Sequence, residues 1–196
     1  MNPLNRRQAL ALAALTLGAC ATGETVPASN LPPGKESIPL GNPGFTPSAN
    51  GKIAGWEGVE HNAGNSYTFL PDTEFLVSAP ASARIRRHGV ELYGLLEQRV
   101  RMQPAWLGRT ARLSGYLRTR GANDEGACLV MQARDGSDSI LVSELMNERR
   151  VKGDTDWKQY AVQFKVPSNA WWLRVGVMLE GGGTLWADDL ALDLMD

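Results

Sequence analysis

The thiol of Cys20 is the side chain whose surroundings in the sequence point most directly to a chemical role. Arg6-Arg7 precede an apolar stretch that ends at Leu17, and the small residues Gly18-Ala19 stand directly before the cysteine. A basic start, an apolar middle and small residues at a cleavage point are typical of an export signal. We therefore expect residues 1–19 to be removed and the mature chain to begin at Cys20, whose thiolate is a nucleophile for covalent attachment.

The run Leu17-Gly18-Ala19-Cys20 resembles the lipobox of bacterial lipoproteins. The resemblance implies that the Cys20 sulfur receives a diacylglycerol and that the new amine is acylated too. Two or three acyl chains hold a protein durably at a membrane, whereas one chain holds it only marginally. The alternatives are an ordinary cleaved signal and a short membrane helix, but the apolar run is shorter than the roughly 20 residues that a membrane span needs.

Two further features of the signal bear on export and localisation. Arg6-Arg7 resembles a twin-arginine signal, but Ala9 stands where that motif prefers Phe, so the general secretory route is the better prediction and the other route stays open. Ala21 follows the cysteine in place of the Asp that retains lipoproteins in the inner membrane. The resemblance thus implies an outer-membrane lipoprotein of the cell envelope, and leaves its periplasmic or surface face open.

Trp172 is the first candidate for ligand binding. It belongs to an alternating segment in which Leu173 and Val175 share one face, so Trp172 and Arg174 share the other. A sugar ring presents apolar C–H patches and a fringe of hydroxyls, and an exposed aromatic ring beside polar groups suits both. The alternative is that a loop or the N-terminal segment covers Trp172.

A second set of candidates consists of Arg101, Arg112, Tyr116 and Arg118. If the segments 92–102 and 111–119 pair as a hairpin, Arg101 lies near Arg112. Like charges that face each other are mildly unfavourable, so this pair predicts an anionic partner such as a uronate or a phosphate. The planar fork of a guanidinium group suits that partner. A solvated sheet face is the alternative interpretation.

The sequence offers few residues for catalysis. It has two histidines, no spacing typical of a zinc site, no Gly-x-Ser-x-Gly elbow and no phosphate-binding loop. A carboxylate pair that forms in space from Glu91, Glu97, Asp188 or Asp189 stays open as a route to hydrolysis. We predict that the protein is not an enzyme.

Composition and length limit the class of protein. Without residues 1–19 the chain keeps 18 basic and 21 acidic residues, a net charge near -3, so no nucleic-acid partner is expected. Once Cys20 is lipidated, Cys128 has no partner for a disulfide. Residues 20–41 are rich in Pro, Gly, Ser and Thr and are predicted to form a flexible, lipid-anchored tether. Residues 42–196 are long enough for one ordinary domain.

The predicted domain consists of short alternating segments separated by turn residues. Apolar and polar residues alternate over 92–102, 111–118, 159–166, 172–180 and 190–194. Turn residues interrupt the pattern at 121–126, 135–136, 152–154 and 181–183. Since no segment carries a full helical stripe, we predict an all-β fold, an antiparallel β-sandwich of the jelly-roll kind.

Four landmarks in this order resemble the galactose-binding-like jelly roll, in particular its carbohydrate-binding-module type. They are Asn42-Pro43-Gly44-Phe45 with Gly55-Trp56, then Leu113-Ser114-Gly115-Tyr116-Leu117-Arg118-Thr119, then Gly153-Asp154-Thr155-Asp156-Trp157, and finally Gly183-Thr184-Leu185-Trp186-Ala187-Asp188-Asp189-Leu190. The resemblance covers nearly all of the chain after the tether. It implies a β-sandwich and often sugar binding, with Trp56, Trp157 and Trp186 in the core or at its ends, although a fold does not by itself establish a function.

A structural calcium ion is the one cofactor that the resemblance raises. Family members often carry a Glu after the Asn-x-Gly-Phe start, and this Glu and the late Asp pair help to hold Ca²⁺, whereas here Thr46 stands in its place. Calcium takes about six to eight oxygen ligands, so Asp188 and Asp189 alone are a poor site. We predict no cofactor, with one of these aspartates facing solvent and the other accepting hydrogen bonds from backbone amides.

These patterns predict a lipid-anchored cell-envelope protein that carries a non-catalytic, carbohydrate-binding-like module. Its expected partners are a membrane, through the anchor, and a glycan. The alternative is an envelope adaptor or structural lipoprotein that binds another protein through a sheet face. Hydrolase activity is the third hypothesis.

Overall fold

A computed structural model of the chain describes residues 35–62 and 64–196. The predicted signal peptide, the lipidation site Cys20 and the first part of the predicted tether lie outside the described residues. Among the residues that the structure describes, no helix is long and apolar enough to cross a membrane.

Strands and one short 3₁₀ helix make up the described part of the chain. The strands are β1 (Lys35–Ile38), β2 (Glu57–Glu60), β3 (Tyr67–Asp72), β4 (Ser82–Arg87), β5 (Tyr93–Arg101), β6 (Thr110–Arg134), β7 (Ile140–Glu144), β8 (Val151–Lys165), β9 (Trp172–Glu180) and β10 (Thr184–Met195). The helix η1 (Pro104–Trp106) lies between β5 and β6. The prediction of an all-β fold is therefore confirmed.

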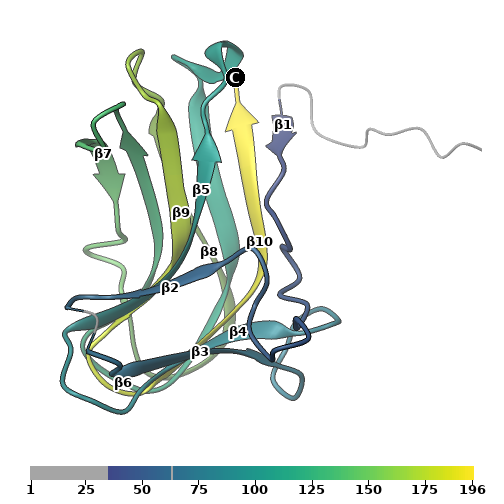
Figure 1. Cartoon of the computed structure of the whole chain (residues 1–196), viewed down its shortest axis with the longest axis vertical. Coiled ribbons are helices and arrows are strands. Elements are labelled where there is room, and N and C mark those ends of the chain that lie inside the picture. Colours follow the sequence, from purple (N-terminus) through teal and green to yellow (C-terminus); the bar gives the residue numbers. More distant parts are fainter. Residues whose placement is uncertain (1–34, 63) are drawn as a thin grey trace, which may run out of the picture. The chain divides into compact units, whose positions relative to one another are not determined.

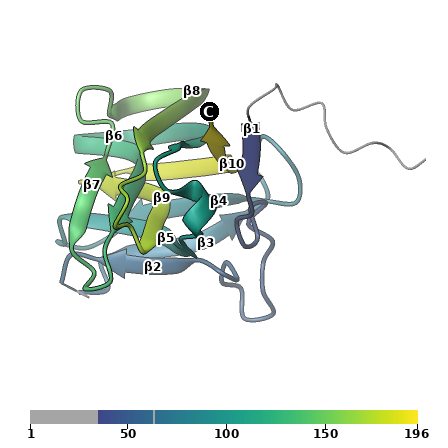
Figure 2. The ribbon, with the colours of Figure 1, turned by 90° about the horizontal axis from the view of Figure 1, so that it is seen from above.

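The strands form two antiparallel sheets that share β6. In the first sheet, the first half of β6 lies between β8 and β10, and β10 pairs in turn with β4, which pairs with β3. In the second sheet, the second half of β6 lies between β7 and β9, and β9 is followed by β5 and β2. Figure 2 shows β8, β6 and β10 as successive ribbons of the first sheet. This arrangement is a β-sandwich.

The core lies between the two sheets and is built from the apolar half of each alternating strand. Leu113 and Leu117 of β6 and Leu185 of β10 face it from the first sheet, and all three are fully buried. Leu96 of β5 and Val177 of β9 face it from the second sheet in one cross-strand row. The alternation read from the sequence thus identified correctly the inner face of β5, β8 and β9, of the first half of β6 and of the end of β10.

Two predicted turns do not interrupt the strands in which they lie. Residues 121–126 fall within β6, and residues 152–154 fall within β8. Gly121, Asp124 and Gly126 have positive φ values of 61°, 52° and 79°, so the chain bends there, and the register between β6 and β8 shifts between Ala122 and Ala127. This bend carries β6 from the first sheet to the second, which explains why turn-type residues stand inside a strand. The turns expected at 135–136 and 181–183 are confirmed.

The predicted hairpin between segments 92–102 and 111–119 is wrong. β5 pairs with β9 and β2, whereas the first half of β6 pairs with β8 and β10. The connection contains η1 with its buried Trp106, and it carries the chain from one sheet to the other. Arg101 therefore faces Trp172 across β5 and β9, not Arg112.

The boundary predicted between tether and domain at residue 41 is also corrected. Residues 35–38 form β1, which pairs antiparallel with the end of β10 and lies alongside it in Figure 1. Ile38 is 2 % exposed and belongs to the core. Residues 20–41 are rich in Pro and Gly, and β1 has only four residues. Such a short strand does not stand out from the surrounding composition, so the sequence did not predict it.

Candidate functional site

The outer face of the first sheet carries polar side chains in register on β6 and β8. Arg112 of β6 is the cross-strand partner of Gln163 of β8, and Tyr116 is the partner of Gln159. These residues alternate with the core residues of the same strands, so their side chains stand on the side away from the core. The predicted candidates Arg112, Tyr116 and Arg118 thus share one face, as their spacing indicated.

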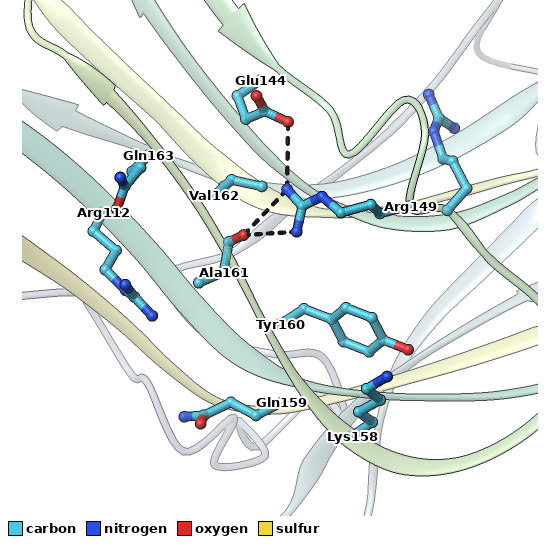
Figure 3. A pocket seen from close by; sticks show the side chains of 10 residues that line it. Arg112, Glu144, Arg149, Lys158, Gln159, Tyr160, Ala161, Val162 and Gln163 are labelled. Carbon is cyan, nitrogen blue, oxygen red and sulfur yellow. Dashed lines mark hydrogen bonds and ion pairs between the residues drawn. The ribbon is translucent and has the colours of Figure 1, made fainter.

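A groove of about 750 Å³ follows the edge strand β8 on both of its sides, and we call it the β8 groove. Its lining residues come from β6, β7, β8 and the loop between β7 and β8: Arg112, Glu144, Arg149, Arg150 and residues 158–163. Figure 3 shows Arg112, Gln159 and Gln163 on one side of the β8 ribbon, and Glu144, Arg149, Tyr160 and Lys158 on the other. A volume of this size lies within the range of about 300–1,000 Å³ that small-ligand sites usually have.

Arg149 lines the β8 groove and contacts the edge of β8. Its Nη1 and Nη2 atoms donate hydrogen bonds to the Ala161 carbonyl oxygen over 3.3 Å and 3.4 Å (Figure 3). Its Nη2 atom also lies 3.9 Å from Oε1 of Glu144. The neighbouring Arg150 lies away from this pair and contacts Glu180 over 2.9 Å. In the described part of the chain no further strand pairs with this edge of β8. Arg149 therefore takes the place of a strand as the hydrogen-bond donor to the Ala161 carbonyl oxygen.

The other polar groups of the groove have no partner within the described residues. No hydrogen bond or ion pair there involves the side chains of Arg112, Lys158, Gln159 or Gln163. Lys158 Nζ lies 5.7 Å from the centroid of the Tyr160 ring. Burial raises the pKa of the Tyr160 hydroxyl, which therefore stays protonated at neutral pH and is able to donate a hydrogen bond. The groove combines an aromatic ring, two amides and two cations.

Arg118 lies on the same face of β6 but outside the groove. Its guanidinium carbon is 4.6 Å from the ring centroid of Phe75 and 5.8 Å from that of Trp186. Trp186 is largely buried on this outer face, where its indole Nε1 donates to Asp72 over 2.9 Å. The expectation that Trp186 fills or plugs the core is therefore corrected, because its side chain packs on the outside of the first sheet, against Phe75.

The candidates Arg101, Trp172 and Arg174 lie together on the outer face of the second sheet. The guanidinium carbon of Arg101 is 3.5 Å from the Trp171 ring centroid and 4.9 Å from that of Trp172. Trp172 is half-buried, whereas Trp171 is 45 % exposed and lines a cleft of about 370 Å³ with Arg101. In this arrangement Arg101 already covers both rings, and the part of these residues in ligand binding stays a prediction.

Arg174 is engaged by Glu97, a residue whose burial the sequence did not indicate. Arg174 Nε lies 2.9 Å from Glu97 Oε2, and Arg99 Nε lies 3.8 Å from Glu97 Oε1. Glu97 is only 2 % exposed, and this burial raises the pKa of its carboxyl group despite the two arginines. Glu57, its cross-strand partner, adds to the rise. Alternation placed Glu97 correctly on the outer face, but an outer face is not always a solvated one.

Asp188 and Asp189 hold a loop instead of forming a metal cluster. Asp188 is fully buried, and its Oδ2 accepts hydrogen bonds from the backbone amides of Val77 and Ser78 over 2.7 Å and 2.9 Å. Asp189 accepts a hydrogen bond from the Ser78 hydroxyl. This agrees with the prediction that one aspartate accepts hydrogen bonds from backbone amides. No group of three or more His, Cys, Asp or Glu side chains in the described ranges is placed to hold a metal ion.

Part of the chain resembles a curated protein in sequence. No family model matches. An uncharacterized HTH-type transcriptional regulator of Bacillus subtilis (strain 168), YbfP, is 33 % identical over 91 residues, which are 46 % of this chain and 30 % of that protein. The chain thus spans about a third of the length of the curated relative that it matches.

Solved structures with a similar fold include carbohydrate-binding modules and part of a larger enzyme. The CBM22-1 xylan-binding domain from Paenibacillus barcinonensis Xyn10C has a TM-score of 0.53 at 13 % identity, and the similarity covers 74 % of this chain and 89 % of that one. A family 16 carbohydrate-binding module has a TM-score of 0.56 at 16 % identity, over 78 % and 97 %. An arabinose-bound α-L-arabinofuranosidase, MgGH51, has a TM-score of 0.59 at 15 % identity, over 80 % of this chain and 26 % of that enzyme. At such identities the similarity establishes the jelly-roll β-sandwich fold and nothing finer.

Proposed function

We propose that this domain binds a carbohydrate chain in the β8 groove without cleaving it. The observation that carries the proposal is that Gln159, Gln163 and Arg112, which share one side of β8, have no partner within the described residues, while the Tyr160 ring lines the same groove from the other side of the strand. Amide and guanidinium groups exchange hydrogen bonds with sugar hydroxyls, and an aromatic ring offers a surface for C–H groups. Polar groups that converge on a groove beside an aromatic ring are typical of ligand sites.

The fold supports this proposal because solved structures of the same architecture bind glycans. One of them is described as a xylan-binding domain, and another, TmCBM61 with a TM-score of 0.50, as a complex with β-1,4-galactotriose. Both are modules, whereas the arabinofuranosidase extends far beyond the part that is similar to this chain. We therefore propose a binding role and no hydrolysis. The match to YbfP is confined to 30 % of that protein, and we transfer no role in transcription from it.

Localisation follows from the N-terminal sequence and is proposed on that basis alone. A diacylglycerol on Cys20 and an acylated amine would hold the domain at the outer membrane of a cell envelope. The residues between Cys20 and β1 would then separate the domain from the lipid surface. Metabolic labelling with a radioactive or clickable fatty acid tests the anchor, and we expect the label to be lost in the Cys20→Ser variant.

A glycan array, followed by calorimetry with the best ligand, tests the proposed binding. We expect the full-length chain to bind, and the double variant Gln159→Ala/Gln163→Ala to lose about tenfold or more in affinity. Each amide contributes about 0.5–1.5 kcal/mol, and about 1.4 kcal/mol corresponds to a factor of ten. Both glutamines are exposed on a strand, so the variant should keep the fold.

Trp172→Ala tests the other candidate site, on the second sheet, and a ligand bound in the β8 groove requires that this variant leave the affinity unchanged. If only Trp172→Ala loses binding, the glycan binds at Trp171 and Trp172 and not in the β8 groove. Absence of binding to every neutral and acidic glycan would contradict the proposal and favour the adaptor hypothesis, in which a sheet face binds another envelope protein.

A further inference from the structure

We infer that the ligand of the β8 groove is an acidic oligosaccharide that carries uronate carboxylates along its chain. The inference rests on the proposed function, because it names the chemical class of the glycan bound there. Three observations support it: the excess of positive charge around the groove, the pairing of Asp193 with Lys35 instead of Arg112, and the positions of Arg112 and Lys158.

The charges around the groove do not cancel. Arg112, Arg149, Arg150 and Lys158 line it, and Glu144 is the one acidic residue among the lining residues. Arg150 has its own carboxylate, Glu180, at 2.9 Å. Glu144 accepts a hydrogen bond from the Met146 amide and lies near Arg149. Among the residues that the structure describes, Arg112 and Lys158 have no negative partner, although the whole chain has a formal net charge of -1.

The isolation of Arg112 has a specific structural cause. Asp193 of β10 is the cross-strand partner of Arg112, and a carboxylate in that position would ordinarily neutralise it. Asp193, however, is 3 % exposed and its Oδ2 lies 2.9 Å from Nζ of Lys35. Since β1 delivers Lys35 to the other side of β10, the guanidinium group of Arg112 is left to a ligand.

Arg112 and Lys158 lie on opposite sides of β8, and the amides of Gln159 and Gln163 both lie on the side of Arg112. Figure 3 shows Arg112 near Gln163 on one side, and Lys158 near the Tyr160 ring on the other. A single small anion would satisfy one of these positions. A sugar chain with carboxylates at intervals is able to satisfy both, while its hydroxyls reach the amides of Gln159 and Gln163. Guanidinium groups bind carboxylates through two parallel hydrogen bonds, which adds to the preference for uronates.

Calorimetry with the full-length chain tests this inference with three probes: galacturonate oligomers, neutral xylan oligomers and polyglutamate of similar length. We expect galacturonate oligomers to bind at least tenfold more tightly than the other two. We further expect that affinity to fall as salt is raised from low to physiological concentration, because salt screens exposed charges. Arg112→Gln and Lys158→Gln should each lower the affinity for galacturonate about tenfold, because each variant removes one charged hydrogen-bond donor.

Lys165→Gln is the matched control, because Lys165 is exposed on β8 like Lys158 but does not line the groove. It should leave the affinity unchanged. Equal binding of neutral and acidic glycans would overturn the inference and leave the proposed function standing. Equal binding of polyglutamate and galacturonate would show that charge alone is recognised and would also overturn it. If no probe and no other glycan binds, both the inference and the proposed function fail.

Discussion

Glu97 and Asp72 are buried carboxylates that both face arginines, yet their surroundings shift their pKa values in opposite directions. For Glu97, burial outweighs the attraction of Arg174 and Arg99 and raises the pKa above its usual value near 4.5. For Asp72, burial acts the same way, but hydrogen bonds from the Trp186 indole and two backbone amides, with the charge of Arg84, lower the pKa below 3.8. The number of donors around each carboxylate therefore decides the sign of the shift.

The opposite shifts predict opposite effects of pH on stability. Because the folded state favours protonated Glu97, the free energy of unfolding should fall as the pH rises from below 4.5 through the raised pKa. Asp72 should stabilise the fold above pH 3.8, and this contribution should be lost as the pH falls through its lowered pKa. Neither slope can exceed about 1.4 kcal/mol per pH unit for one proton.

Chemical denaturation of the protein and of the variants Glu97→Gln and Asp72→Asn between pH 3 and 7 measures these slopes. The stability difference between protein and variant should decrease with rising pH for Glu97 and increase for Asp72. A difference with the same pH dependence at both positions would contradict the assignment. The slopes are compared and not the absolute stabilities, because each variant also leaves an arginine without its carboxylate.

Among the elements, β6 has the largest influence on the architecture because one strand belongs to both sheets. The bend between its halves depends on glycines at positive φ. At Gly126 an added Cβ would lie 2.5 Å from the Val151 carbonyl oxygen, a backbone atom of β8 that is not free to move away. At Gly121, also at positive φ, an added Cβ would meet nothing within 4 Å. Both glycines require a strained backbone conformation of any other residue, but only Gly126 also lacks room for a side chain. A comparison of the two positions therefore distinguishes the two effects.

Gly126→Ala should therefore destabilise the protein more than Gly121→Ala. A non-glycine residue in the left-handed region costs about 1–2 kcal/mol, and both variants incur this cost. Overpacking against β8 should add about 1–3 kcal/mol at Gly126 alone. Urea denaturation followed by tryptophan fluorescence gives the two free energies of unfolding. An equal decrease in the free energy of unfolding of both variants would contradict this prediction, because it would mean that β8 moves away from residue 126 without cost.

For the molecule as a whole, the buried thiol of Cys128 reports on cooperative unfolding. Cys128 is fully buried in β6, and burial raises the pKa of its thiol to about 12, with Arg150 opposing and Glu180 and Glu144 adding to the shift. A thiol with this pKa supplies almost no thiolate at neutral pH, and thiolate is the reactive form. Because β6 joins both sheets, we expect Cys128 to become accessible only when the sandwich opens.

Alkylation with iodoacetamide, followed by mass spectrometry of the Cys128 peptide, measures this protection. We expect no modification of Cys128 in the folded protein over hours and complete modification in denaturant. At intermediate denaturant concentrations, the rate of alkylation should be proportional to the fraction of unfolded protein. Rapid modification in native buffer would show that the second sheet opens locally, without unfolding of the first.

For five alternating segments, which fall in β5, β6, β8, β9 and β10, the sequence by itself determined which side chains face the core and which face outward. Apolar and polar residues alternate with the period of a strand, so the outward positions of Arg112, Tyr116, Gln159 and Gln163 could be read directly. The jelly-roll fold followed from the same alternation and from four landmarks. The alternation depends only on neighbouring residues of one strand, so it can be recognised without knowing which strands pair.

The tertiary structure decided which strands are neighbours and which charges cancel. It placed Arg101 against Trp171 and Trp172, and separated it from Arg112, because β5 and β6 begin in different sheets. It formed the β8 groove from residues of β6, β7, β8 and the loop between β7 and β8, and it paired Asp193 with Lys35, so that Arg112 has no ion pair within the described residues. These contacts join segments far apart in the chain, and their pairing depends on how the two sheets close over a common core, which no single segment encodes.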